Sequence, residues 1–249
     1  MTRRFYADAA SLAGSQVEID GALAHRTAKV LRMRVGDEVI LFDGGGEDVR
    51  VCLDEVGDRL IRATVIERSP GPIEPRLKVH VYQSITKGDR FEWLLEKATE
   101  LGVSSITPLL AARAVVKTGG DGNRAERWRR IVSEAAEQCE RSTVPAIGAP
   151  RSFDAALGDA PGIVILPYEE AGDRAPNIND IMNRRVDDVF ALAAVSVFIG
   201  PEGGYEAGEI ERAAAAGAEI VTLGARVLRS ETAGLVAATL VMQSVGELG

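Results

Sequence analysis

The C-terminal third of the chain contains one pattern twice: a short apolar run, a loop with glycine, and a segment of helix-forming residues. The apolar runs cover 195–199 and 220–223, and the loops cover 200–204 and 224–229. Short β-branched runs that end abruptly at glycine predict buried strands. Two successive strand, loop and helix units therefore predict a parallel α/β sheet with both loops side by side at the carboxyl ends of its strands, where such sheets bind ligands.

The helical segments after the two loops differ in character. The first covers 206–216 and is followed by Gly217, which suits the left-handed position after a helix. The second begins at Ser230, carries Glu231 in its first turn and is then rich in alanine and valine. Such an apolar helix is either buried in the core or part of a dimer interface, and the sequence does not decide between the two.

The 249 residues, 46% of them hydrophobic and 27% charged, are enough for one large or two modest globular domains. The longest apolar run, 189–200, is too short to cross a bilayer, and the N-terminus has no apolar signal core. We therefore expect no membrane partner and a cytoplasmic location. Cys52 and Cys139 lie far apart and without clustered histidine, so neither a disulfide framework nor a metal site is expected.

The net charge of −8 is unevenly distributed along the chain. Residues 76–150 carry 12 basic and 9 acidic side chains, whereas residues 151–249 carry 7 basic and 15 acidic side chains. Basic residues cluster at 3–4, 26–34 and 124–130. Any single cluster is typical of a solvated face, but binding a polyanion requires only local positive potential, and three clusters together favour such a partner.

Residues 1–70 are predicted to form a small β-rich domain. The glycines at 44–46 lie between two apolar runs and lack the Lys-Ser/Thr ending of a phosphate loop, so they predict a hairpin turn. Residues 69–75 contain three prolines and predict a stiff linker, after which a second domain covers 76–249. The predicted elements of the first domain are a helical segment at 22–31 and strands at 37–42, 49–53 and 59–67.

Strands and amphipathic helices alternate through the second domain, which is typical of an α/β fold. On the helix predicted at 90–101, Phe91, Leu94 and Leu95 belong to one apolar stripe. The stretch at 173–188, rich in Asp, Asn and Arg, is predicted to be a surface excursion. Further strands are predicted at 77–83, 105–110 and 162–166, and a further helix at 124–141.

The common catalytic motifs are poorly represented in this chain. His25 and His80 are its two histidines, which disfavours a Ser-His-Asp or Cys-His hydrolase, and the motifs of zinc proteases, EF-hands and early Rossmann dinucleotide sites are missing. The glycine loops instead let the main chain approach a flat ligand closely. Arg226 and Arg229, with polar residues after them, favour a binding loop over a purely structural turn.

The motifs IGPEGG at 199–204 and LGARVLRSETA at 223–233 are specific when taken together. With them the chain resembles the ribosomal RNA uridine-N3 methyltransferases of the RsmE type, members of the SPOUT superfamily. The resemblance extends to SITKGDRFEWLLEKATELGVSSITPL and RWRRIVSEAAEQCERSTVP in the second domain, and to RRFY and HRTAKVLRMRVGDEVILFDG in the first. Tyr205, where the family is expected to have Phe, is a mild departure, and so is Cys139.

This resemblance implies an α/β protein with a small PUA-like β-barrel as its N-terminal RNA-binding domain and a SPOUT-type domain with a C-terminal trefoil knot. It also implies a homodimer, S-adenosylmethionine as methyl donor without a metal, and N3 of a uridine in 16S rRNA of the small ribosomal subunit as acceptor. The residues expected to bind the donor are Leu166, Ile199, Gly200, Pro201, Glu202, Gly203, Gly204, Leu223, Gly224, Arg226, Val227, Leu228 and Thr232.

Two side chains are candidates for the chemistry that the resemblance implies. We expect Glu202 to accept or position the N3 proton and Arg229 to stabilise the negative charge that develops on the base. The structural alternatives are a bond from Glu202 to loop amides and an ion pair of Arg229 with Glu231 or a contact with phosphate. The residues expected to contact RNA are Arg3, Arg4, Arg26, Arg32, Arg34, Lys87 and Arg90.

Two other functions stay open at this point. One is methylation of tRNA or of another rRNA by an enzyme of the same superfamily. The other is a non-catalytic RNA- or nucleotide-binding protein that uses the same loops without methyl transfer.

Overall fold

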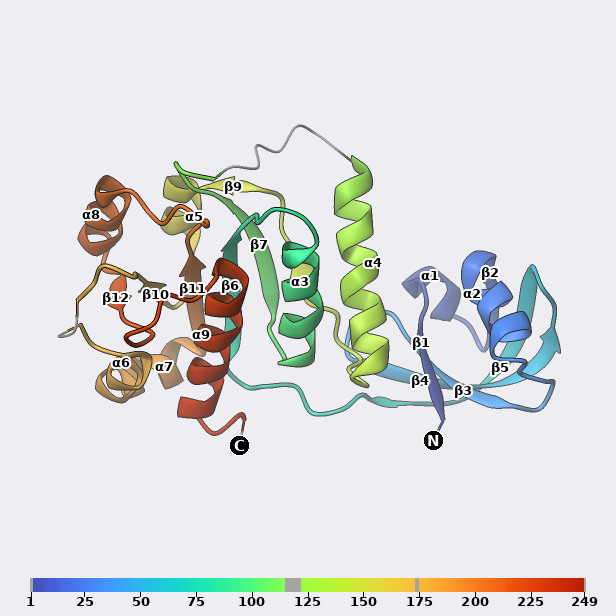
Figure 1. The fold of residues 1–249 in the computed structure, drawn as a ribbon. Coiled ribbons are helices and arrows are strands. Elements are labelled where there is room, and N and C mark those ends of the chain that lie inside the picture. The colour runs from blue at the N-terminus through green and yellow to red at the C-terminus, as the bar shows by residue number, and fades with distance from the viewer. Residues whose placement is uncertain (1, 115–121, 173–174, 249) are drawn as a thin grey trace. The chain divides into compact units, whose positions relative to one another are not determined.

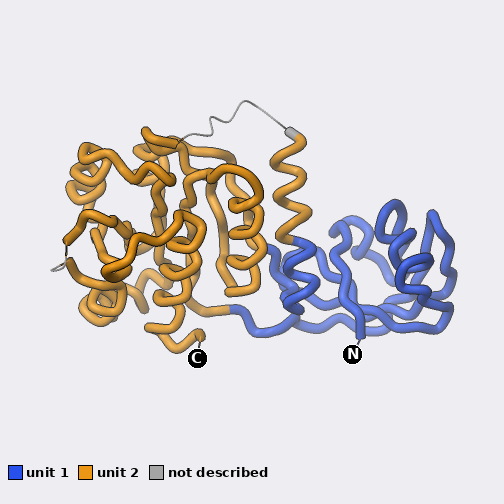
Figure 2. The backbone as a smooth tube through the Cα atoms, viewed as in Figure 1, with its two compact units in different colours: residues 1–74, 133–144 blue, residues 75–132, 145–249 orange. Residues whose placement is uncertain are grey.

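The computed structural model describes residues 2–114, 122–172 and 175–248. The chain divides into two compact units, residues 1–74 with 133–144 and residues 75–132 with 145–249 (Figure 2). The predicted helix at 124–141 is present as α4, Gly122–Gln138, and its last residues belong to the first unit. Two separate segments of the chain therefore form that unit.

A five-stranded sheet with the order β1-β3-β4-β5-β2 forms the first unit (Figure 1). The predicted hairpin is confirmed, because β3 and β4 pair antiparallel on either side of the glycines. Two bulges in the pairing of β4 with β5 bend the sheet, as expected of a PUA-like domain. The elements are β1 Arg3–Tyr6, α1 Ala9–Leu12, β2 Gln16–Asp20, α2 Gly21–His25, the π-helix η1 Arg26–Val30, β3 Glu38–Phe42, β4 Glu47–Val56 and β5 Leu60–Pro70.

Two elements of the first unit differ from the prediction. The helical segment at 22–31 divides into the short α2 and the π-helix η1. Ser69 and Pro70, assigned to the linker, continue β5 and pair with Asp48 and Glu47. A proline is tolerated there because it is the last residue of the strand, where a missing N–H does not interrupt the ladder.

The second unit contains a seven-stranded sheet with the order β12-β10-β11-β6-β7-β8, in which β9 also pairs with β7. All of its pairings are parallel, which confirms the predicted α/β fold. Its strands are β6 Lys78–Ser84, β7 Ser105–Leu110, β8 Ala146–Ile147, β9 Arg151–Ser152, β10 Ile163–Pro167, β11 Ala194–Ile199 and β12 Glu219–Val221. Its helices besides α4 are α3 Arg90–Glu100, α5 Phe153–Asp159, α6 Ile178–Arg184, α7 Val186–Leu192, α8 Ala207–Ala215 and α9 Ser230–Ser244.

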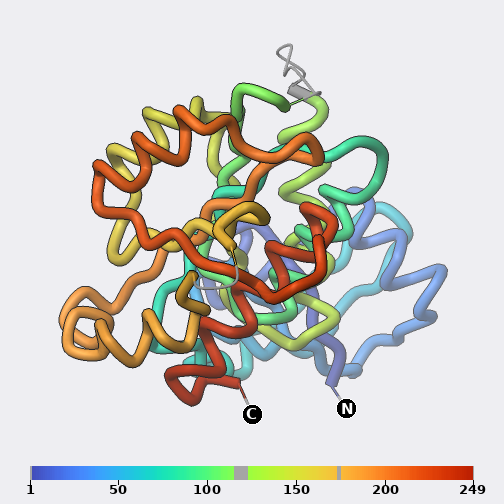
Figure 3. The backbone as a smooth tube through the Cα atoms, turned by 60° about the vertical axis from the view of Figure 1, so that its left-hand side comes forward, coloured from blue at the N-terminus to red at the C-terminus, as the bar shows by residue number. Residues whose placement is uncertain are grey.

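The final helix, α9, packs into the core of the second unit. It contacts α3, α6, β6 and β11 (Figure 3, red). Gly234 allows this close approach, since a Cβ there would lie 2.5 Å from Oε1 of Gln83 and 2.8 Å from Cδ1 of Leu94. The inward face of α9 is therefore core, while Leu235, Val236 and Leu240 on the same helix stay half-buried.

The stretch at 173–188, predicted as a surface excursion, contains α6 and the beginning of α7, while residues 173 and 174 lie outside the described residues. Asn177 caps α6 by accepting a hydrogen bond from the Asp180 amide, and Asp180 accepts one from the Asn177 amide. Ile178, Ile181 and Met182 are buried in this helix. The prediction was wrong here because these few apolar residues are spaced along one helical face among many polar ones. Within the described parts of the chain, no helix is both long enough and apolar enough to span a membrane.

Candidate functional site

The carboxyl ends of β10, β11 and β12 surround a pocket of about 440 Å³ in the second unit. The loops after β11 and β12 line this pocket together, as expected, although β10 lies between the two strands in the sheet. The end of β10 therefore joins them at the pocket. The lining residues are Arg90, Pro167, Tyr168, Glu169, Ile199, Gly200, Pro201, Glu202, Gly204, Thr222, Leu223, Gly224, Arg226, Val227, Leu228, Arg229, Ser230 and Ala233.

The glycine loop after β11 is shaped by its close neighbours. A Cβ on Gly200 would lie 3.0 Å from the ring of Tyr205, a distance that real side chains do not tolerate without a shift. Gly204 has a φ of +70°, in the left-handed region that favours glycine. Arg113 donates a 3.2 Å hydrogen bond to the Gly203 carbonyl and so holds the loop from outside the pocket.

A chain of buried hydrogen bonds ties this loop to the beginning of α9. The Gln83 side-chain amide donates to Ser230 Oγ at 2.8 Å, and Ser230 Oγ donates to the Gly200 carbonyl at 2.5 Å. Both side chains are buried away from water, so these hydrogen bonds supply the partners that their polar atoms need. The position of the glycine loop is thus coupled to the end of β6 and the first turn of α9.

The loop after β12 forms an apolar rim of the pocket. Val227 is 83% exposed although it lines the pocket, and Leu223 and Leu228 are half-buried beside it. Arg226 and Arg229 on the same loop are exposed. An exposed valine next to glycines and apolar neighbours suits a ligand with a flat apolar surface.

Charged side chains from α3, the glycine loop and α9 meet at one end of the pocket. The Arg90 guanidinium donates a 2.7 Å hydrogen bond to Oε1 of Glu202, and its Nε lies 3.8 Å from Oε1 of Glu231. Glu231 is buried, and its Oε2 has no hydrogen-bond partner among the described residues. Glu202 is therefore held in place by a cation.

The predicted donor-binding residues are mostly brought together here. Those that line the pocket are Ile199, Gly200, Pro201, Glu202, Gly204, Leu223, Gly224, Arg226, Val227 and Leu228, together with the candidate Arg229. Leu166 lies fully buried on β10, Gly203 lies against Arg113, and Thr232 lines a neighbouring cleft.

The sequence prediction included Leu166 of β10 but missed the lining residues that come next, Pro167 at the end of this strand and Tyr168 and Glu169 after it, and also Thr222 and Ser230. A signal for these residues was available, because parallel strands present their carboxyl ends at one edge of the sheet and 162–166 was predicted as a strand.

This second cleft, next to the pocket, has a volume of about 660 Å³ and shares two residues, Arg90 and Arg229, with the pocket. The remaining lining residues are Lys87, Gly88, Asp89, Trp93, Glu231 and Thr232. Lys87 and Arg90, both predicted to contact RNA, are thus together at this cleft, next to the two candidates for chemistry.

The other predicted RNA contacts lie in the first unit, where some are held in ion pairs and the others are exposed. Arg4 is 8% exposed at its side chain and forms a bidentate ion pair with Asp48, at 2.6 and 2.8 Å. Arg26 forms an ion pair with Glu137 at 2.8 Å. Burial raises the pKa of the Glu137 carboxyl above its ordinary value, although the hydrogen bond from the Tyr6 amide and the Arg26 charge lower it. The exposed members of the set are Arg3, Arg32 and Arg34.

Other titratable groups near the sheet do not supply a base or a metal site. Burial, together with Glu209 and Glu169, raises the pKa of Tyr205 well above 10, so its phenol stays neutral. His80 lies on β6 with Nδ1 2.7 Å from Ser105 Oγ, and burial followed by the Lys78 charge lowers its pKa. The described residues contain no group of His, Cys, Asp and Glu that could hold a metal ion.

Two protein-family models match this chain. Residues 73–242 match the model of an RNA methyltransferase domain, and residues 28–66 match that of an RNA methyltransferase PUA domain. Two solved structures resemble the whole chain and are described as bound to S-adenosylmethionine. A ribosomal RNA small subunit methyltransferase E from Neisseria gonorrhoeae has 32% identity, a TM-score of 0.84 and 98% coverage of both chains. A putative methyltransferase from Legionella pneumophila has 28% identity, a TM-score of 0.82 and the same coverage.

A curated relative from Bacillus subtilis gives the same result at the level of sequence. It is named ribosomal RNA small subunit methyltransferase E and is 33% identical over 225 residues, which is 88% of this chain and 86% of that protein. This similarity covers most of the chain, and the matched family model includes both glycine loops. The chain therefore belongs to the ribosomal RNA small subunit methyltransferase E family.

Proposed function

We propose that this protein transfers the methyl group of S-adenosylmethionine to N3 of a uridine in 16S rRNA of the small ribosomal subunit. The pocket at the ends of β10, β11 and β12 carries the proposal, because its glycine loop and apolar rim fit a flat, bulky donor. When bound, S-adenosylmethionine supplies the electrophilic carbon. The carbon–sulfur bond breaks as the carbon–nitrogen bond forms, S-adenosylhomocysteine leaves, and the N3 proton passes to an acceptor.

The chain's own residues have to position the donor and handle that proton. The donor-binding set consists of the predicted residues that line the pocket, together with Leu166, Gly203 and Thr232. Glu202 accepts or positions the proton while Arg90 holds its carboxylate, and Arg229 stabilises the negative charge on the base. No metal is required for this chemistry.

The wider setting is part of the same proposal. Residues 1–70 form the PUA-like RNA-binding domain, whose compact unit also includes residues 133–144. The rest of residues 76–249 forms the SPOUT domain, with a trefoil knot in its C-terminal segment. Two copies form a homodimer, and the interface between them includes the half-buried outer face of α9. The enzyme acts in the cytoplasm on the small ribosomal subunit or its late precursor.

Mass spectrometry of 16S rRNA from cells that lack the protein tests this function most directly. We expect one uridine to lose its N3 methyl group, and the purified protein with S-adenosylmethionine to restore it. A fully modified 16S rRNA in cells without any redundant enzyme contradicts the assignment, and a tRNA methyl group lost instead indicates the alternative substrate. Calorimetry with S-adenosylmethionine separates an enzyme from a binder that does not use the donor.

A further inference from the structure

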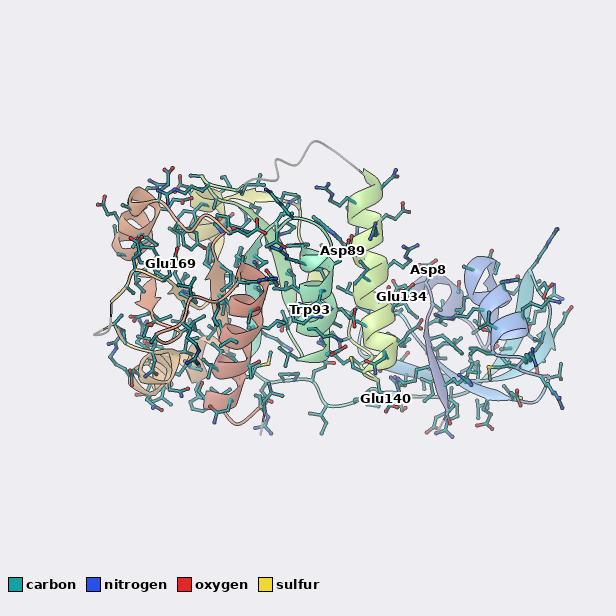
Figure 4. All side chains as sticks on the ribbon, viewed as in Figure 1. Asp8, Asp89, Trp93, Glu134, Glu140 and Glu169 are labelled. Atoms are coloured by element: carbon teal, nitrogen blue, oxygen red, sulfur yellow. The ribbon has the colours of Figure 1, made fainter. Side chains whose placement is uncertain are left out.

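Trp93 is an exposed aromatic residue on α3 and does not belong to the buried apolar face of that helix. Phe91 and Leu94 on the same helix are buried, whereas the Trp93 side chain is 46% exposed and lines the second cleft. Figure 4 labels Trp93 on α3. Its amide donates to the carbonyl of Asp89, so the indole follows the cleft residue Asp89 by one helical turn. Packing of α3 therefore does not explain a tryptophan at this position.

The charges around Trp93 are mixed in sign. Lys87, Arg90 and Arg229 are the cations of the cleft, and Asp89 and Glu231 are its carboxylates. Arg90 is occupied by Glu202 and Glu231, whereas Lys87 and Arg229 are exposed and form no ion pair with any residue that the structure describes. An uncharged ring with a phosphate beside it suits this arrangement better than a bare anion does.

The cleft also lies next to the donor pocket. Arg90 and Arg229 line both cavities, so a ring bound against Trp93 is adjacent to a ligand in the pocket. Methyl transfer requires the acceptor atom to lie close to the donor carbon and in line with the bond that breaks. Aromatic side chains are the usual platforms for unpaired bases, since every base presents a π-face.

We propose that the cleft lined by Trp93 is the acceptor-nucleotide site, in which the indole stacks on an unpaired base of the RNA while Lys87 neutralises its phosphate and Arg229 keeps its role toward the base. This inference rests on the proposed methyl transfer and adds to it the site that receives the acceptor. Trp93 is a binding residue in this scheme, because it contacts the base without exchanging a proton with it.

Steady-state kinetics with small ribosomal subunits from cells lacking the protein tests the site. Loss of one stacked base costs about 1–3 kcal/mol, so Trp93→Ala is expected to raise KM for subunits by about 5- to 150-fold. The Kd for S-adenosylmethionine stays unchanged, and Trp93→Phe retains most of the affinity. Phe190→Ala, which removes another exposed aromatic side chain, is the matched control and is expected to behave as wild type.

Tryptophan fluorescence provides a readout that does not depend on turnover. The chain has two tryptophans, and Trp128 is buried, so the difference between wild type and Trp93→Phe reports Trp93. Single-stranded oligouridylate is expected to quench this difference signal and to protect it from iodide. A signal indifferent to oligouridylate contradicts the proposal.

The outcomes separate this inference from the function on which it rests. If wild type does not methylate the subunits, the proposed function fails. If wild type is active and Trp93→Ala has an unchanged KM, the function stands and the acceptor site is wrong. A third outcome is that sedimentation experiments show a dimer of wild type but a monomer of Trp93→Ala, and that the KM of the variant recovers at high protein concentration. Trp93 is then a contact between two copies of the chain, and the inference is overturned.

Discussion

Arg90, at the first residue of α3, donates a 2.7 Å hydrogen bond to Glu202 in the glycine loop, 112 residues further along the chain. The two side chains are 44% and 28% exposed, so this pair contributes little to stability, about 0–1 kcal/mol. Its consequence is positional: the carboxylate of Glu202 is fixed at the end of the pocket that borders the second cleft.

Glu202→Gln tests whether that carboxylate takes part in the chemistry. We expect turnover to fall by about 100- to 10,000-fold, because a proton acceptor is removed, while the Kd for S-adenosylmethionine changes little. Glu206→Gln is the matched control, since Glu206 is an exposed carboxylate just after the same loop that does not line the pocket, and Gln retains an oxygen for its capping role at the start of α8. Rapid-quench kinetics and calorimetry measure the two quantities. Full turnover in Glu202→Gln removes Glu202 from the mechanism.

Gly200→Ala is expected to distort the glycine loop. The new methyl group would lie 3.0 Å from the Tyr205 ring in a packed region, and overpacking of this kind costs about 1–3 kcal/mol. A lower free energy of unfolding and weaker donor binding should appear together. In Gly203→Ala the nearest atom is Arg113 Cβ at 3.5 Å, an ordinary contact, so this variant should retain its free energy of unfolding. Equal losses in the two variants would show that the Tyr205 contact is not the cause.

Arg3 and Arg4 are expected to differ although they are neighbours in one basic cluster. Arg4→Ala leaves Asp48 unpaired in a largely buried position, which costs about 3–5 kcal/mol of stability. Arg3→Ala removes an exposed charge, so stability is retained while rRNA affinity falls and the slope of log K against log salt decreases by about 1. Thermal unfolding and salt titrations of RNA binding measure these effects. A salt slope unaltered in Arg3→Ala excludes a phosphate contact at that residue.

The stability of the second unit is expected to depend on pH through His80. Burial and the Lys78 charge lower the pKa of His80 below its ordinary value of 6.5. The unfolded chain therefore binds the proton more readily, and stability falls as the pH drops from 6.5 through the lowered pKa. His80→Asn should flatten this part of the profile in urea unfolding, with His25→Asn as the control for loss of an imidazole. An identical pH dependence in wild type and His80→Asn would contradict the shift.

Prediction from the sequence succeeded where the signal was local. The glycine at 217 has a φ of +87° just after α8, as a residue in the left-handed position after a helix should. The apolar stripe with Phe91, Leu94 and Leu95 is buried, because side chains three and four residues apart share a helix face. It failed for α6, in which three apolar residues stand among four polar ones.

The sequence by itself determined the α/β class, the two glycine loops and most of the side chains that line the pocket, because strand and helix periodicity and the conformational freedom of glycine act over a few residues. Only the tertiary structure decided that β10 lies between β11 and β12, that Glu169 and Ser230 join the pocket, and that Arg90 holds Glu202. The physical reason is that strand order and long-range contacts result from packing of the whole sheet, which no short stretch of residues specifies.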